Sequence, residues 1–283
     1  MLLKDIKNIF HKELDTLYPL EEVNSFFYRM IEHYLGLERF VLAIEPDISM
    51  TKEEEAPLFE GLAQLKLERP LQYILGKAYF MDLEFMVNEH VLIPRPETEE
   101  LTRWIIGEVQ ENKPTVRILD IGTGSGCIAI SLAKYIPNAE VLALDVSNEA
   151  LKIAKENATG NDVDVDFFHW NILSKKTMGR KFDIIVSNPP YVRQLEKKEI
   201  LKNVKDFEPG LALFVSNEEP LIFFDGIGKF AKEHLDKEGQ LYLEINQYLG
   251  KETEQLLKHQ NFLEIELRKD MFGNDRMLRG RLD

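Results

Sequence analysis

Cysteine and long apolar runs are nearly absent from this sequence. One cysteine, Cys127, among 283 residues excludes an internal disulfide and a cysteine-based metal cluster. No segment reaches the roughly 18 to 20 consecutive apolar residues that a membrane-spanning helix needs. The first residues also lack the basic region and the apolar stretch of a secretory signal. We therefore expect a cytoplasmic protein without a membrane partner.

Histidine and positive charge are scarce as well. The six histidines are scattered and form no pair at metal-ligand spacing, so we expect no metal site. Lysine and arginine number 35 against 49 acidic residues, which gives a formal net charge of −14. A charge of this sign repels nucleic-acid phosphates and favours a basic partner. We therefore expect no direct binding of nucleic acid, with the provision that a local basic patch would override this bias.

The first 68 residues predict a small helical bundle. Their apolar residues recur every three to four positions, which places them on one face of each helix. Thr51 followed by Glu54 is the signature of a capping box at a helix start. Because no catalytic side chains converge here, we interpret residues 1–68 as a substrate-recognition or lid domain. The expected helices span about 2–17, 23–34, 38–45 and 51–67.

Residues 69–95 predict a linker that contains a β-hairpin. Segments 78–80 and 83–87 have the composition of two short strands joined by a turn. Prolines at the end of this region then make a stiff, extended connector. The acidic residues after Pro96 suit the first turn of a helix, which we expect to run to about residue 110.

Residues 96–283 predict an α/β domain. Apolar, β-branched strands alternate with helices, which favours a mostly parallel sheet covered on both faces. The last two strands have no helix between them, so we expect an antiparallel pair there. Strands are expected at 116–121, 140–146, 164–169, 182–187, 239–245, 262–269 and 276–282, and helices at 126–136, 148–158, 219–236 and 249–260. The predicted fold is a Rossmann-like, seven-stranded domain preceded by the helical bundle and the hairpin linker.

A glycine-rich loop follows the first strand of this domain. Its glycines permit a tight turn and the close approach of a ligand to the backbone. The third glycine of a dinucleotide-binding fingerprint would stand at position 127, which is Cys127, a residue that we interpret as helix packing. The loop therefore favours the amino-acid part of S-adenosylmethionine over a pyrophosphate. The predicted cofactor contacts are Gly122, Thr123, Gly124, Ser125 and Gly126.

The ends of the second and third strands supply further candidate cofactor ligands. Asp145 ends the second strand, where an acid can accept both ribose hydroxyls. Its alternative role is to cap the next helix, although Ser147 suits that role better. Asn171 follows the third strand, and its side-chain oxygen can accept a hydrogen bond from the adenine amine. Trp170 either contacts adenine or packs in the core, and the sequence leaves both open.

The motif Asn-Pro-Pro-Tyr at residues 188–191 carries the chemistry. Two prolines cannot continue a β-ladder, so they hold a stiff loop at the carboxyl edge of the sheet, where such folds bind ligands. A planar amide or exocyclic amine is a weak nucleophile, because its lone pair is delocalised. The Asn188 side-chain carbonyl and the Pro189 backbone carbonyl can each accept one N–H and orient this nitrogen, and Tyr191 can stack on the planar group. Proximity and alignment would supply most of the rate.

The alternative, a proline-rich turn with a structural asparagine, is disfavoured by the glycine loop and by Asp145 upstream. The motif predicts transfer of a methyl group to a planar nitrogen. The acceptor is either a nucleobase amine or a glutamine side-chain amide. We assign catalysis to Asn188, Pro189 and Tyr191, substrate binding to Asn188, Pro189, Pro190 and Tyr191, and further cofactor contacts to Asp145, Asn171 and Asn188.

Four segments together resemble the HemK/PrmC family. They are the Leu-Ile-Pro-Arg-Pro-Glu-Thr-Glu segment at 92–99, the glycine loop at 120–126, the motif at 188–191, and the tail at 270–276 with Gly280. The similarity extends from the N-terminal helices to the C-terminus. The segment at 92–99 discriminates best, because adenine methyltransferases share the glycine loop and the Asn-Pro-Pro-Tyr motif but generally lack it.

The HemK/PrmC family comprises protein-glutamine N5-methyltransferases that act on peptide chain release factors. The resemblance implies S-adenosylmethionine as methyl donor and the glutamine of the release factors' Gly-Gly-Gln loop as acceptor, a modification that modulates translation termination. It also implies that the N-terminal helices dock the release factor. Two residues depart from the family pattern: Asn171 stands where an acid is usual, and Asn246 where a glycine or histidine is more typical.

An N6-adenine methyltransferase acting on DNA or RNA is the alternative function. The acidic balance of the chain argues against this alternative and agrees with a protein substrate. A substrate loop that works against ribosomal RNA should be basic, and a basic loop suits an acidic enzyme. An enzyme of duplex DNA must also flip its target base, usually beside a basic groove. The first 90 residues contain no basic cluster.

Overall fold

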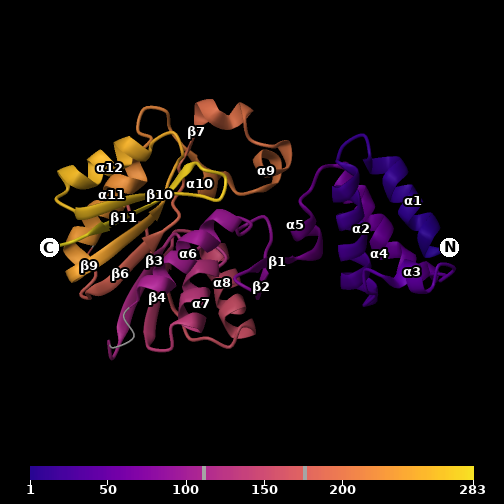
Figure 1. Ribbon diagram of the computed structural model, residues 1–283, viewed down its shortest axis with the longest axis horizontal. Coiled ribbons are helices and arrows are strands. Elements are labelled where there is room, and N and C mark those ends of the chain that lie inside the picture. The colour runs from indigo at the N-terminus through magenta and orange to yellow at the C-terminus, as the bar shows by residue number, and fades with distance from the viewer. Residues whose placement is uncertain (110–112, 175–176) are drawn as a thin grey trace. The chain divides into compact units, whose positions relative to one another are not determined.

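The computed structural model describes residues 1–109, 113–174 and 177–283, and it divides into two compact units (Figure 1). The first unit comprises Met1–Gly76 together with Lys202–Phe207. The second unit comprises Lys77–Leu201 and Glu208–Asp283. None of the helices in the described ranges has the length and apolar character required to cross a membrane.

The first unit is a helical bundle around an apolar core. Its helices are α1 (Leu3–Leu14), α2 (Leu20–Leu35), α3 (Val41–Ile44), α4 (Lys52–Lys66), α5 (Leu71–Leu75) and α9 (Lys202–Phe207). The apolar face of each long helix is buried, as its spacing predicts, with Phe10, Phe27 and Leu58 inaccessible to solvent. The capping box is also confirmed, because the Thr51 hydroxyl accepts from the Glu54 N–H and the Glu54 carboxylate accepts from the Thr51 N–H.

The predicted hairpin is present and packs in the second unit. Strands β1 (Lys77–Phe80) and β2 (Leu83–Met86) are antiparallel, with Phe80 opposite Leu83. Phe80 and Phe85 are buried in the same core as the helices that follow. The boundaries expected at residues 68 and 95 stay predictions about domains, whereas the compact unit itself extends to Gly76.

The second unit is built on a seven-stranded sheet with the order β10-β11-β9-β6-β3-β4-β5. Its strands are β3 (Val116–Ile121), β4 (Ala139–Asp145), β5 (Asp166–His169), β6 (Phe182–Ser187), β9 (Leu235–Glu244), β10 (Leu263–Lys269) and β11 (Asp275–Arg281). The five strands from β9 to β5 are parallel, and β11 is antiparallel to both β9 and β10. The predicted fold class and the antiparallel end of the sheet are thus confirmed.

Helices cover both faces of this sheet (Figure 1). One face packs against α6 (Pro96–Glu108), α7 (Cys127–Tyr135) and α8 (Asn148–Gly160), and the other against α11 (Ile222–His234) and α12 (Gly250–His259). Neighbouring residues of a strand serve opposite cores: Ile118 belongs to the first core and Leu119 to the second. Burial on both faces explains why these strands lack the polar alternation of a half-exposed sheet.

Several short elements between 192 and 215 have no counterpart in the sequence-based expectation. They are β7 (Val192–Arg193), the 3-10 helix η1 (Gln194–Lys198), α9, α10 (Gly210–Leu213) and β8 (Phe214–Val215). Elements of two to six residues are too short to produce a detectable apolar period. The short α5 was missed for the same reason.

The largest difference at a strand boundary is at the start of β9, and one helix end cannot be compared. Strand β9 begins at Leu235 rather than at 239, because the chain passes an irregularity at Glu238 (φ +62°) before it continues in the sheet. In the sequence, only the residues after this irregularity have the apolar pattern of a strand, so the strand was expected to begin there. The end of α6 expected near residue 110 lies outside the described residues, and the described helix ends at Glu108.

Candidate active site

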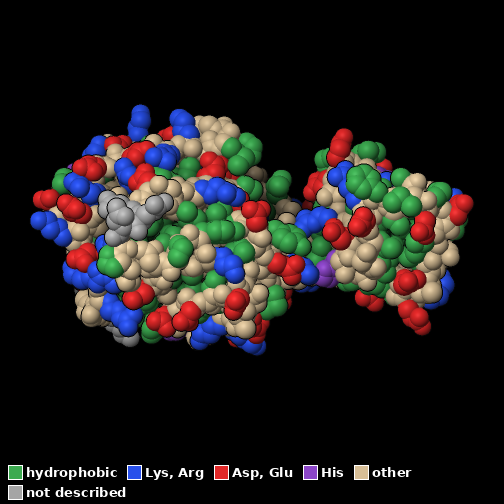
Figure 2. Space-filling model, turned by 60° about the horizontal axis from the view of Figure 1, so that its bottom comes forward, with side chains coloured by type: hydrophobic (Ala, Val, Ile, Leu, Met, Phe, Trp, Pro, Cys, Tyr) green, Lys and Arg blue, Asp and Glu red, His purple; other side chains and the backbone are tan. Residues whose placement is uncertain are grey.

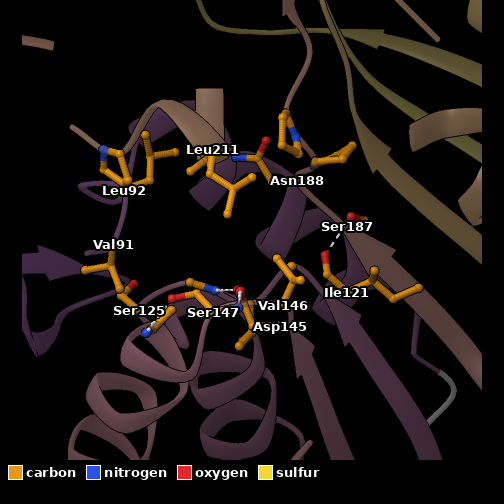
Figure 3. A pocket seen from close by; sticks show the side chains of 18 of the residues that line it. Val91, Leu92, Ile121, Ser125, Asp145, Val146, Ser147, Ser187, Asn188 and Leu211 are labelled. Carbon is orange, nitrogen blue, oxygen red and sulfur yellow. Dashed lines mark hydrogen bonds between the residues drawn. The ribbon is translucent and has the colours of Figure 1, made fainter. Parts of the chain in front are cut away.

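A cavity of about 240 Å³ opens where β3, β4 and β6 end. Parallel pairing aligns these ends: Ile121 is paired with Leu144 on one side and with Ser187 on the other, and the Ser187 hydroxyl donates to the Ile121 carbonyl at 2.6 Å. Figure 3 shows Asp145, Val146 and Ser147 on one side of the cavity and Asn188 and Leu211 on the opposite side. Of the predicted site residues, the cavity lining contains Gly122, Thr123, Gly124, Ser125, Asp145, Asn171, Asn188, Pro189 and Pro190.

The glycine loop adopts a backbone that only glycine takes without strain. Gly122, Gly124 and Gly126 have φ values of +75°, +56° and +84°. A Cβ on Gly122 or Gly124 would meet no protein atom within 4 Å, so both border free space. A Cβ on Gly126 would lie 2.8 Å from Ile130 Cδ1. Gly126 therefore has a packing role and is absent from the cavity lining, so its predicted cofactor contact stays a prediction.

Asp145 faces the cavity with both carboxylate oxygens held by the backbone. Oδ2 accepts from the Gly124 N–H at 2.9 Å and Oδ1 from the Ser147 N–H at 2.8 Å. Ser147 itself caps α8 by accepting from the Ala150 N–H, as its sequence position suggested. Burial raises the pKa of Asp145, although these N–H bonds oppose the shift. Each oxygen keeps a second lone pair, so the carboxylate can still accept from a ligand.

Asp120 lies beneath the glycine loop and is fully buried. Its Oδ2 accepts from the Thr123 hydroxyl at 2.6 Å, which fixes the second residue of the loop. The backbone N–H of Ala129 also faces this carboxyl group and, with Thr123, opposes the rise of its pKa. Burial raises the pKa of Asp120 to about 7, with the nearby Asp145 carboxylate adding to the shift. The loop therefore rests on a carboxyl group that is easily protonated.

Trp170 and Asn171 line the cavity beyond the end of β5. The Asn171 oxygen accepts from the Leu173 N–H at 2.9 Å, which closes a local turn. The Trp170 ring packs against the core on the α11 side of the sheet, and the same side chain borders the cavity. Both readings of Trp170, core packing and ligand contact, are therefore compatible with its position.

Cys127 is buried at the start of α7 beside the cavity. Burial raises the pKa of its thiol to about 12. A thiol with this pKa stays protonated at neutral pH and is a poor nucleophile. This agrees with the packing role that its position in the sequence suggested.

Asn188 occupies the first position after β6 and reaches across to α6. Its Nδ2 donates to the Thr98 hydroxyl at 3.1 Å. Thr98 in turn donates to Glu244 Oε2 at 2.5 Å, and both Thr98 and Glu244 are 2% exposed. Burial raises the pKa of Glu244, and the hydrogen bonds from Thr98 and Tyr191 oppose this shift. Three segments far apart in sequence thus converge on one buried carboxylate.

Tyr191 is held in place through its hydroxyl, and its predicted stacking role stays a prediction. It is absent from the cavity lining, and its hydroxyl donates to Glu244 Oε1 at 2.8 Å. Arg276 Nη1 approaches the same hydroxyl at 3.4 Å, and the Asn246 amide donates to the Tyr191 carbonyl at 2.9 Å. Burial and the Glu244 charge raise the pKa of Tyr191 well above its ordinary value. The hydrogen bonds of its hydroxyl with Glu244 and Arg276 thus anchor the Tyr191 side chain inside the protein.

An ion pair joins two loops that line the cavity. Arg95 Nη2 donates to the buried Glu208 carboxylate at 2.5 Å, and the Ile93 N–H donates to its other oxygen at 3.2 Å. Leu92 and Pro94 from the first loop and Pro209 and Leu211 from the second border the cavity, as Figure 3 shows for Leu92 and Leu211. Neither Glu208 nor Leu211 belongs to a motif, so the sequence offered no signal for them.

Thr98 and Glu244 were also overlooked as site residues. Thr98 lies in the segment at 92–99 that discriminates best between families. The sequence therefore indicated that this residue matters, but it did not indicate what the residue does. Glu244 ends β9, and an acid at a strand end on the ligand-binding edge was the available signal. Asn246, noted as a departure from the family pattern, also bonds Glu196 and so supports the backbone after Tyr191.

Charge is mixed on the face of the second unit that is visible in Figure 2. On this face, lysine and arginine side chains are interspersed with acidic ones. In the part of the chain that the structure describes, no group of three or more histidine, cysteine or acidic residues has a metal-binding arrangement.

Comparison with known proteins places this site in a family. A family model described as the Methyltransferase small domain matches residues 97–206, and the PrmC N-terminal domain matches residues 26–76. The release factor glutamine methyltransferase of Flavobacterium psychrophilum is 50% identical over 281 residues, which covers 99% of both chains. That of Bacteroides thetaiotaomicron is 42% identical over 94% of this chain and 95% of its own.

Among solved structures, a methyltransferase from Pyrococcus furiosus aligns with 82% of this chain and 98% of its own. Its TM-score is 0.52 and its identity 18%, a likeness of fold. The curated relatives carry the stronger conclusion, because half of all positions agree over nearly the whole length. The resemblance inferred from the sequence motifs is confirmed: the chain belongs to the release factor glutamine methyltransferase family.

Proposed function

We propose that this protein transfers a methyl group from S-adenosylmethionine to the side-chain amide N5 of the glutamine in the Gly-Gly-Gln loop of peptide chain release factors. The observation that carries the chemistry is the Asn188 side chain, whose nitrogen is bound to Thr98 while the residue lines the cavity. The family supports the choice of acceptor, since its curated members are named for it.

The cofactor half of the cavity fits S-adenosylmethionine. Gly122 and Gly124 leave space that a Cβ would fill, so a ligand can lie against the loop backbone. We assign the amino-acid part to this loop, the ribose hydroxyls to Asp145, and the adenine to the region of Trp170 and Asn171. When bound, S-adenosylmethionine supplies a methyl group on a positively charged sulfur, which is a good electrophile.

The acceptor half holds a planar amide for attack. The Asn188 Oδ1 and the Pro189 backbone carbonyl each accept one N–H of the glutamine amide, and Pro190 keeps the loop stiff. These two hydrogen bonds orient the nitrogen and raise its electron density as its lone pair leaves conjugation with the carbonyl. No strong base is required, because the proton leaves to solvent after transfer. Alignment of the two reactants supplies most of the acceleration.

A protein substrate suits the charge of the chain. The formal net charge of −14 attracts a basic loop and repels nucleic acid. We assign the docking of the release factor to the N-terminal helices of residues 1–68, with 69–95 as linker and 96–283 as catalytic domain. Release factors act with the ribosome, which places the reaction in the cytoplasm.

Methyl labelling tests this function directly. The purified protein is incubated with S-adenosylmethionine carrying a labelled methyl group and with a purified release factor, and the loop peptide is then analysed by mass spectrometry. We expect one methyl group on the glutamine of the Gly-Gly-Gln loop. A release factor with asparagine in place of that glutamine is the matched control and should stay unlabelled. Label found only in added RNA or DNA would show an adenine methyltransferase instead.

A further inference from the structure

The amide of Asn188 has two ends of nearly equal size, and only one of them serves the reaction. An acceptor amide that must be held through its N–H groups needs the oxygen of Asn188, whereas the NH2 group would repel it. Shape alone does not select between the two orientations, because a turn by 180° changes the occupied volume very little. The inference that follows rests on the proposed function, and it concerns what selects the productive end.

Hydrogen-bond directions in the buried network select the orientation. The Thr98 hydroxyl donates its single proton to Glu244 Oε2 at 2.5 Å, the direction that holds whenever Glu244 is ionised and can only accept. Thr98 Oγ1 can then only accept from Asn188, which must present Nδ2 at 3.1 Å. In the described ranges 1–109, 113–174 and 177–283, no protein group hydrogen bonds to Asn188 Oδ1. The oxygen is the end left over for a ligand.

The carboxylate is held from its other side as well. Tyr191 donates its hydroxyl proton to Glu244 Oε1 at 2.8 Å, and Arg276 Nη1 faces the Tyr191 oxygen at 3.4 Å. Arg276 is fixed by Asp270, whose Oδ2 accepts from its Nε at 3.1 Å. Every proton on the path from Arg276 to Glu244 therefore points toward the carboxylate, which keeps it an acceptor for Thr98.

We propose that Thr98 and Glu244 are positioning residues that set the polarity of the Asn188 amide, so that its oxygen faces the acceptor. The pair acts through Asn188 and makes no bond to the reacting atoms. The segment at 92–99, which distinguishes this family from adenine methyltransferases, thus contributes the Thr98 hydroxyl. Because this hydroxyl donates its proton to Glu244, it can only accept from Asn188. Thr98 is a threonine because valine has the same shape but lacks this acceptor.

Three variants and one matched control test this. Thr98→Val removes the hydroxyl and keeps the shape, and it should lower kcat about 10- to 100-fold while the dissociation constant of S-adenosylmethionine stays within about threefold. Thr98→Ser keeps the hydroxyl and should restore kcat to within about threefold of the parent. Glu244→Gln can donate its NH2 to Thr98, which lets Thr98 donate to Asn188 and inverts the amide, so kcat should fall at least as far as in Thr98→Val.

Thr102→Val is the control for the loss of a buried hydroxyl. Thr102 is fully buried one turn further along α6, and its hydroxyl donates to the Thr98 carbonyl rather than to the network. Its kcat should stay within about threefold of the parent. Equal losses in Thr102→Val and Thr98→Val, or a Thr98→Ser variant as slow as Thr98→Val, would overturn the proposal.

A measurement without turnover separates this inference from the proposed function. The side-chain NH2 signal of Asn188 is identified by NMR as the signal missing from Asn188→Asp, and the hydrogen exchange of its two protons is compared. We expect one slowly exchanging proton in the parent and in Thr98→Ser, and none in Thr98→Val. Slow exchange with no methylation of any release factor would leave the positioning intact and refute the substrate. Fast exchange in the parent would refute the positioning even if methylation occurs.

Discussion

The cofactor half and the acceptor half of the cavity are built in different ways. Gly122, Gly124 and Asp145 form the cofactor half from two adjacent strand ends, and they act largely through backbone conformation and backbone N–H groups. The acceptor half is formed by side chains from α6, the β6 end and the β9 end, where Asn188, Thr98 and Glu244 meet. The first half is thus local in sequence, and the second depends on three distant segments.

This difference has a functional consequence. A loop that acts through its backbone tolerates variation in its side chains but not in its glycines. A site built on a directed hydrogen-bond network fails when any one donor or acceptor is lost, because the groups beyond it lose their orientation. Mutations in the two halves should therefore separate into effects on donor binding and effects on turnover.

The largest effect is expected from Asn188→Ala, which removes the acceptor contact together with the hydrogen bond to Thr98. We expect kcat to fall about a thousandfold, as for loss of a catalytic hydrogen-bonding group, while the dissociation constant of S-adenosylmethionine changes by no more than about threefold. Steady-state kinetics and isothermal titration calorimetry measure the two quantities. Turnover equal to the parent would remove the proposed mechanism.

A glycine substitution should give the opposite pattern. Gly124→Ala places a Cβ in space beside the cavity and strains a residue at φ +56°, so the dissociation constant of S-adenosylmethionine should rise about 10- to 30-fold. At saturating donor, kcat should change far less. Gly107→Ala is the matched control, because a Cβ there meets nothing and alanine favours the helix α6, with a gain of about 0.5 to 1 kcal/mol in unfolding free energy. Similar donor affinities for the two variants would contradict the role of the loop.

The buried Asp120 beneath the glycine loop allows the cofactor half of the cavity to be tested through the pH dependence of stability. Its pKa is about 7 in the folded protein against an ordinary value of 3.8, so between these pH values the folded state holds a proton that the unfolded state has released. The contribution of Asp120 to the free energy of unfolding is fully present below pH 3.8. It is lost as pH rises through 7, with a slope of at most about 1.4 kcal/mol per pH unit. Asp120→Asn should abolish this decline.

Urea unfolding measures this difference from pH 4 to pH 8. Trp104 and Trp170 both lie in the second unit, so tryptophan fluorescence reports on that unit alone. The quantity to compare is the stability of the parent minus that of Asp120→Asn at each pH, which cancels the contribution of other titrating groups. A difference that is constant with pH would show that Asp120 does not titrate in this range.

The smallest effect is expected for Tyr191→Phe. The ring is kept and only the hydroxyl bonded to Glu244 is lost, which leaves one carboxylate oxygen without its donor. We expect a three- to fivefold decrease in kcat and a loss of about 1 kcal/mol in unfolding free energy. If both values equal those of the parent, the hydroxyl anchors nothing, and the original expectation of a stacking ring becomes the better interpretation.

Much of the second unit could be predicted from sequence because its signals are local. The strand from Val116 to Ile121 followed by three glycines, and the strand from Phe182 to Ser187 followed by two prolines, each combine an apolar run with residues that end it. The elements between 192 and 215 escaped prediction, since two to six residues carry no period. The stacking role of Tyr191 stays a prediction, and the hydrogen bond of its hydroxyl to Glu244 escaped prediction because a motif does not reveal where a hydroxyl finds a partner.

The sequence by itself determined the fold class, the position of the cavity edge, and the chemistry expected of residues 188–191. These follow from backbone restrictions of glycine and proline, which act within a few residues. Only the tertiary structure decided that Thr98 and Glu244 stand behind Asn188, that Tyr191 is an anchor, and that Glu208 ties Arg95 beside the cavity. The physical reason is that a hydrogen bond depends on distance and direction between groups that sheet pairing and helix packing bring together from 50 to 150 residues apart.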